Sequence, residues 1–216
     1  RVGGECRGVG RGRSRRRRTP SVPGVSVSRS EAEVHWREFL ESLRKRGLHG
    51  LLLAVSERGH AQLRQALAAT FPGVPWQRCQ FHLQQNAAAQ IPKVSMRQPV
   101  AHALRAVFNA PNLQEAERLL ELFVAKYEKS APGLADWAQT NVPEGFAVFA
   151  IPVAHQRFLR TSNMLERQNR EIKRRTRVAT LFPNDASLLR LVTAVLMEVS
   201  EEWETGRRYL TMESPE

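Results

Sequence analysis

The sequence has no long apolar run, and no stretch approaches the roughly 18 uninterrupted apolar residues that a membrane helix needs. No apolar segment follows the positive charges near the first residue, so no signal peptide is expected. Cysteine is scarce too, because Cys6 and Cys79 are the only two and cannot build a disulfide framework. These absences argue against a membrane protein and a disulfide-stabilised scaffold, and they favour a reducing cytoplasm.

Acidic residues are outnumbered: 33 Lys and Arg stand against 21 Asp and Glu, a formal net charge of +12. Nine arginines and one glutamate lie within residues 1–30, whereas residues 31–216 carry a net charge of only +4. That second excess comes from residues 160–177, where seven basic residues accompany two glutamates. Positive charge concentrated in this way favours a polyanionic partner.

Residues 1–20 show almost no apolar periodicity, so we expect them to be disordered. Two interpretations stay open. The first is a nucleic-acid-binding arm, for example a nonspecific RNA binder. The second, which we favour, is a segment that did not evolve as protein structure. The missing initiating methionine and the change of composition near Pro23 indicate an upstream truncation or a frame disruption.

The first globular segment is expected to contain a strand and a helix. Residues 24–28 alternate like a short strand, and Ser30 is a suitable N-cap for a helix over 31–46. The helix should end before Gly47. It should direct three apolar side chains toward a core, namely Val34, Phe39 and Leu43.

A strand–helix–strand unit is expected next. Residues 51–55 form a short apolar run typical of a buried strand, and a helix over 60–70 follows. After a turn at 72–75, residues 76–81 again resemble a strand. This order predicts an α/β sheet covered by helices.

After His82 the sequence predicts helices alone, separated by prolines. The predicted helices cover residues 82–91, 97–108, 113–128, 132–140, 163–177, 186–203 and 204–210.

Cys79-x-x-His82 stands at the end of the second predicted strand. A Cys-x-x-His pair can supply half of the ligands of a zinc site. Because Cys6 is the only other cysteine and no other close Cys/His pair exists, we favour a structural role at the strand end.

The basic segment 161–177 predicts a helix with one stripe that suits phosphates. That stripe contains Asn163, Arg167, Arg170, Arg174 and Arg177. From the residues alone, Glu166 has a structural interpretation, because it can form a capping box with Asn163 and an ordinary i,i+4 pair with Arg170. Glu171 and Arg175 have the same i,i+4 spacing.

Two segments resemble Mutator-type bacterial insertion-sequence transposases, and the resemblance covers roughly residues 24–210, as the C-terminal portion of such a protein. The first matches the family signature in spacing at Leu63, Thr70-Phe71-Pro72, Val74, Gln77, Cys79 and His82. That signature opens with an aspartate and a glycine, where this chain has Glu57, one position early, and Gln62. The second segment is Asn163-x-x-Glu166-x-x-Asn169, followed by Ile172-Lys173-x-Arg175.

The resemblance implies an α/β fold: an incomplete ribonuclease H-like, integrase-like domain with an all-α insertion and a helical C-terminal region. The implied organisation is a tail at 1–23, a partial α/β core at 24–91, a helical insertion at 92–160 and a helical part of the catalytic domain at 161–216.

The resemblance also implies a chemistry: hydrolysis of a phosphodiester at the element end, then attack of the freed 3′-hydroxyl on target DNA. Three carboxylates would hold Mg²⁺ or Mn²⁺. Glu166 would be one ligand and Glu57 would replace a second, but no predicted strand carries the remaining one, so metal binding should be weak. DNA phosphates would be held by Arg167, Arg170, Lys173, Arg174, Arg175 and Arg177. Cys79, His82 and Asn163 would be motif residues.

The implied partners are DNA, both element ends and target, and another copy of the chain or a full-length transposase. The implied location is the bacterial cytoplasm, at the nucleoid when DNA is bound. An alternative stays open, in which a non-catalytic fragment binds DNA or a partner and interferes with full-length transposase.

Overall fold

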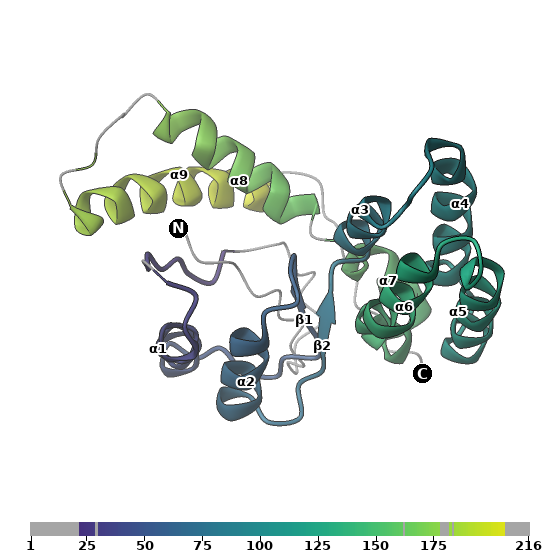
Figure 1. The fold of residues 1–216 in the computed structure, drawn as a ribbon. Coiled ribbons are helices and arrows are strands. Elements are labelled where there is room, and N and C mark those ends of the chain that lie inside the picture. The colour runs from purple at the N-terminus through teal and green to yellow at the C-terminus, as the bar shows by residue number, and fades with distance from the viewer. Residues whose placement is uncertain (1–21, 29, 162, 178–181, 183, 206–216) are drawn as a thin grey trace. The chain divides into compact units, whose positions relative to one another are not determined.

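The computed structural model describes residues 22–28, 30–161, 163–177, 182 and 184–205, and these form two compact units (Figure 1). We call the first the paired-helix unit, which comprises Arg1–Leu52, His60–Val74 and Asn163–Glu216 in so far as they are described. The second is the sheet unit, with Leu53–Gly59 and Pro75–Ser162. The Arg-rich tail and most of the predicted helix at 204–210 lie outside the described residues. No described helix is long and apolar enough to cross a membrane.

The sheet unit contains two short parallel strands, β1 (Ala54–Ser56) and β2 (Trp76–Arg78). Their register pairs Val55 with Gln77. The predicted strand–helix–strand unit is confirmed, but both strands are shorter than expected. The second ends early because the chain leaves the sheet after Cys79: the backbone N–H of Gln80 donates to Arg160 O at 2.9 Å, and α3 (Gln80–Ala89) begins there.

Helices make up the rest of the sheet unit. They are α4 (Arg97–Phe108), α5 (Leu113–Tyr127), α6 (Pro132–Asn141) and α7 (Val153–Leu159), with 3-10 turns η1 (Val94–Met96), η2 (Val142–Gly145) and η3 (Ala147–Ala150). The predicted bounds of α4 are confirmed, and those of α5 and α6 to within one residue. The sequence did not predict α7.

One apolar core holds α3–α6 together. Leu83, Leu104 and Leu134 have at most 1% of their surface exposed, and Phe108 stacks edge-on against Phe146 with ring centroids 6.4 Å apart. Burial of apolar surface on this scale is the main stabilising contribution to a helical layer.

The paired-helix unit contains α1 (Glu33–Lys45), α2 (Ala61–Thr70), α8 (Asn163–Thr176) and α9 (Asp185–Thr205). Helix α1 packs on α2 and buries Phe39 and Leu43, as predicted. The prediction for Val34 is wrong, since its side chain is 54% exposed. Val34 precedes Leu43 by about two and a half helical turns and therefore lies on the opposite side of α1.

Two further local predictions for this segment are wrong. Ala32, not Ser30, is the N-cap of α1, and no side chain bonds the free N–H groups there. Residues 24–28 form only an isolated bridge at Val27 rather than a strand. The end of α1 is as expected, because Gly47 adopts φ = +97°, a left-handed conformation that favours glycine after a helix.

Candidate nucleic-acid interface

Helix α8 packs on α9 through an apolar contact. Ile172 is 7% exposed and contacts a cluster formed by Val192, Val195 and Leu196 of α9. This contact determines which side of α8 faces α9 and which side stays exposed to solvent.

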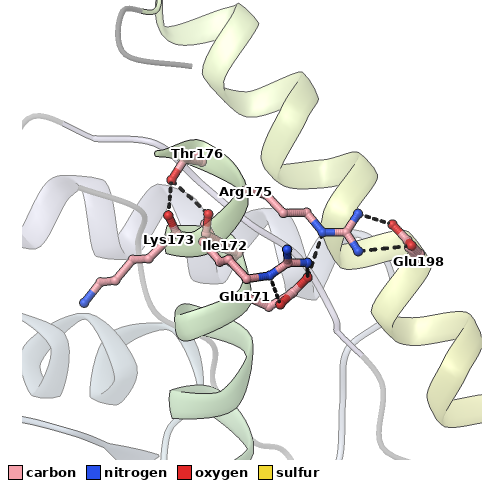
Figure 2. A network of polar contacts seen from close by, with 7 residues as sticks. Glu171, Ile172, Lys173, Arg175, Thr176 and Glu198 are labelled. Carbon is pink, nitrogen blue, oxygen red and sulfur yellow. Dashed lines mark hydrogen bonds and ion pairs between the residues drawn. The ribbon is translucent and has the colours of Figure 1, made fainter. Parts of the chain in front are cut away.

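Figure 2 shows the ion pairs that Arg175 forms with Glu171 and Glu198. Arg175 Nε donates to Glu171 Oε1 at 2.8 Å, and Arg175 Nη2 donates to Glu198 Oε1 at 3.1 Å, so one guanidinium joins α8 to α9. Arg174 donates to both carboxylate oxygens of Glu171, at 3.0 and 2.6 Å. The predicted Glu171–Arg175 pair is confirmed, and it belongs to a four-residue network.

The network shifts the pKa values of its members. Hydrogen bonds from Arg174 and then Arg175 lower the pKa of Glu171 from 4.5 to about 2. Hydrogen bonds to Glu198, and to a smaller extent to Glu171, raise the pKa of Arg175. The hydrogen bond from Arg175 lowers the pKa of Glu198. All of these side chains therefore carry their charges at neutral pH.

The other side of the helix carries exposed cations, which we call the α8 basic face: Arg170, Lys173, Arg174 and Arg177. The side chain of Arg174 remains 68% exposed although it bonds Glu171. Spacings of three and four residues place the four on one side of the helix. Exposed cations in a row can contact successive phosphates of a nucleic acid. Two other residues that were predicted to bind DNA are not part of this face. Arg175 bonds the carboxylates of Glu171 and Glu198. The side chain of Arg167 lies outside the described residues.

Glu166 lies in the first turn of α8, half-buried, on the side of the helix that carries the basic face. Asn163 is the first helical residue. Its side chain lies outside the described residues, so the capping box with Glu166 stays a prediction.

Three motif residues lie at the carboxyl ends of the two strands in the sheet unit. Glu57 directly follows β1 and Cys79 directly follows β2, and the Cys79 N–H donates to Ser56 O at 2.8 Å. Cys79 is fully buried at the N-cap of α3, and His82 lies in the first turn of that helix. The parallel register thus brings together the strand ends that carry Glu57 and Cys79.

A divalent metal needs several ligands, and the two candidate carboxylates belong to different units: Glu57 to the sheet unit and Glu166 to the paired-helix unit. Among the described residues, neither unit taken by itself gathers three Cys, His, Asp or Glu ligands. Each carboxylate offers the oxygen atoms that Mg²⁺ prefers. One such side chain does not make a metal centre.

The structural roles of two buried glutamines in the same motif were not predicted from the sequence, although Gln77 belongs to the family signature. Gln77 Nε2 donates to Leu159 O at 3.0 Å, and its Oε1 accepts from the Val148 N–H at 2.6 Å. Gln80 Nε2 donates to Gly145 O at 2.8 Å. These side chains satisfy backbone groups of η2, η3 and α7. No local pattern marks them, because their partners lie more than 60 residues further along the chain.

Residues 19–206 match the family model of the Mutator family of transposases, and the chain belongs to that family. It is 54% identical over 189 residues to the transposase for insertion sequence element IS406 of Burkholderia multivorans, covering 88% of this chain and 48% of the relative. The transposase for ISRM5 of Rhizobium meliloti is 35% identical over 89% of the chain and 48% of its own length. The transposase for IS256 in transposon Tn4001 of Staphylococcus aureus is 32% identical over 89% and 49%.

The chain thus spans about half the length of the curated relatives it matches. Both motifs that carry the resemblance in the sequence lie inside the matched region. The family match therefore covers every residue that the structure describes.

Proposed function

We propose that the chain is the part of an insertion-sequence transposase that holds DNA through the α8 basic face. The observation that carries this proposal is the division of α8 into two sides. Its apolar and ion-paired side is occupied by α9, whereas Arg170, Lys173 and Arg177 remain exposed on the other side. Cations left free by the packing of their own helix are available for phosphates.

The test is DNA affinity, measured by fluorescence anisotropy with a labelled duplex of an insertion-element end. Replacing Arg170, Lys173 and Arg177 by alanine leaves the Arg174–Glu171–Arg175–Glu198 network in place. We expect this triple variant to bind at least about tenfold more weakly at physiological salt, since up to three phosphate contacts are lost.

A matched control removes the same charge from another helix of the same unit, through Arg37→Ala, Arg44→Ala and Lys45→Ala on α1, all exposed. The proposal requires the affinity of the control variant to stay within about threefold of the unmodified chain, since these cations lie outside the proposed DNA-binding face and charges beyond direct contact are screened by salt. Equal losses in both triple variants would mean that net charge alone drives binding and that the α8 basic face has no special role.

Strand cleavage and transfer are the activities we propose for the assembled transposase, on a ribonuclease H-like sheet of which β1 and β2 would be two strands. In that proposal Glu57 and Glu166 are the carboxylates that this chain contributes to a Mg²⁺ or Mn²⁺ centre. The metal would activate the attacking oxygen and stabilise the leaving one. Cleavage of an element-end duplex that is lost in Glu166→Gln, with DNA affinity retained, would support this role.

A second candidate is a non-catalytic protein that binds DNA or full-length transposase. It is favoured by Glu57, which stands one position before the aspartate of the family signature, and by the single candidate carboxylate in each unit. Tight, salt-dependent DNA binding without cleavage in Mg²⁺ or Mn²⁺ would favour this candidate. Cleavage that depends on Glu166 would exclude it.

A further inference from the structure

Arg160 directly follows α7 in the sheet unit, and its side chain is held in one orientation. Its Nη1 donates to Asn109 Oδ1 at 2.5 Å, and its Nη2 donates to Gln156 Oε1 at 3.4 Å. Gln156 is itself fixed, with only 4% of its surface exposed and its Nε2 bonded to Ile151 O at 2.9 Å. Asn109 is the C-cap of α4. The guanidinium is therefore anchored to two helices by neutral side chains.

The positive charge of Arg160 is not balanced by these contacts. Both acceptors are neutral amides, and within the described part of the chain no carboxylate bonds this guanidinium. Its Nε is buried without a hydrogen-bond partner there. Burial lowers the pKa of Arg160. An arginine still remains charged at neutral pH, so the cost of its desolvation is not offset.

Other partly buried arginines of the protein have carboxylate partners. Arg78 Nη1 lies 3.3 Å from Glu144 Oε2, and Arg175 bonds both Glu171 and Glu198. In the described part of the chain the other partly buried arginines are paired with acids, whereas Arg160 is fixed in place by neutral groups and keeps one N–H on each Nη for another acceptor.

We propose that Arg160 binds a phosphate of the DNA backbone, as a pre-oriented contact of the sheet unit additional to the α8 basic face. A phosphodiester supplies the missing negative charge, and its oxygens match the fork geometry of a guanidinium. This inference rests on the proposed function, because the same duplex is the ligand. It adds a DNA contact outside the predicted DNA-binding set of residues 167–177.

The test compares Arg160→Gln with Arg157→Gln in the full chain. Arg157 is an exposed cation of α7 whose guanidinium carbon lies 4.5 Å from the ring centroid of Phe158, so its removal changes the net charge equally. DNA affinity is measured by anisotropy across a salt series. We expect Arg160→Gln to weaken binding about tenfold and to make the slope of log K against log salt less steep by about 0.9, the value for one phosphate contact. Arg157→Gln should leave both quantities nearly unchanged.

Arg160→Lys provides a second readout, since it keeps the charge but loses the fork and its anchoring. It should retain the salt slope and bind roughly threefold to tenfold more weakly. If Arg160→Gln fails to fold, as judged by circular dichroism, the affinity of Arg160→Lys decides, and an unchanged affinity would overturn the inference.

The outcomes separate this inference from the proposed function. If Arg160→Gln has the DNA affinity and salt slope of the unmodified chain while the triple variant of α8 binds weakly, only the proposed Arg160 contact is overturned. Absence of salt-dependent DNA binding by the unmodified chain would overturn both.

Discussion

Replacing Gln77 by leucine tests whether the buried side chain of the family motif holds the sheet unit together. Gln77 has 0% of its surface exposed and bonds two backbone groups, Leu159 O and the Val148 N–H. Leucine has a similar volume but leaves both groups buried without partners. Each such loss costs about 1–3 kcal/mol, and the added apolar burial offsets about 1–2 kcal/mol of the sum. The expected net loss is about 2–4 kcal/mol of unfolding free energy.

The assay is urea unfolding of the full chain, followed by hydrogen exchange at Val148. With an m-value of about 2 kcal/mol/M, the midpoint should fall by about 1–2 M, and the Val148 amide should exchange faster. Gln85→Leu on the exposed side of α3 is the control and should change stability by no more than about 0.5 kcal/mol. Equal midpoints for the two variants would refute the structural role assigned to Gln77.

Three further predictions concern local features. Gly145→Ala should destabilise the sheet unit by about 1–3 kcal/mol in urea unfolding, because its Cβ would lie 2.8 Å from Phe108; Gly133→Ala, which meets nothing within 4 Å, should not. Asn112→Ala should cost about 1 kcal/mol in the same assay, since the Asn112 side chain caps α5 by accepting the N–H of Glu115 at 2.9 Å; no loss would contradict the cap. Glu171, whose folded-state pKa is about 2 rather than 4.5, stabilises the α8–α9 contact above pH 4.5, and this contribution is lost as the pH falls toward 2. The protection factors of the α8 amides, which correct for the intrinsic pH dependence of exchange, should therefore fall across that window in the unmodified chain and much less in Glu171→Gln; identical profiles would contradict this assignment.

The long helices of this protein could be predicted from the sequence because their signals are local. The bounds of α4 were predicted to the residue. Residues 163–177 also predicted α8 to within one residue at its end. In both segments the signals are the helical spacing of apolar or basic side chains and a flanking proline or asparagine. These signals lie within the helix or next to it.

The strands and the start of α1 could not be predicted as well, because non-local contacts decide them. β1 and β2 have three residues each, too few for a clear alternation, and their ends depend on pairing between residues about 22 positions apart. Ser30 has the residue type of a cap but lies two positions before Ala32, the actual N-cap.

The candidate site was predicted only in part, because some of its features depend on contacts between distant segments. The row of cations on α8 follows from spacing alone, whereas the contact of Arg175 with Glu198 on another helix does not. The division at 24–91, 92–160 and 161–216 stays a prediction. In the structure, parallel pairing groups residues 53–59 with 75–162.

The most direct test of the central claim is to map where DNA touches the chain. A duplex with photoreactive groups on its backbone is cross-linked to the full chain, and the modified residues are identified by mass spectrometry. The account predicts cross-links within residues 166–177 that disappear when Arg170, Lys173 and Arg177 are replaced by alanine. Cross-links confined to segments outside α8 and Arg160, or unchanged in the triple variant, would contradict it.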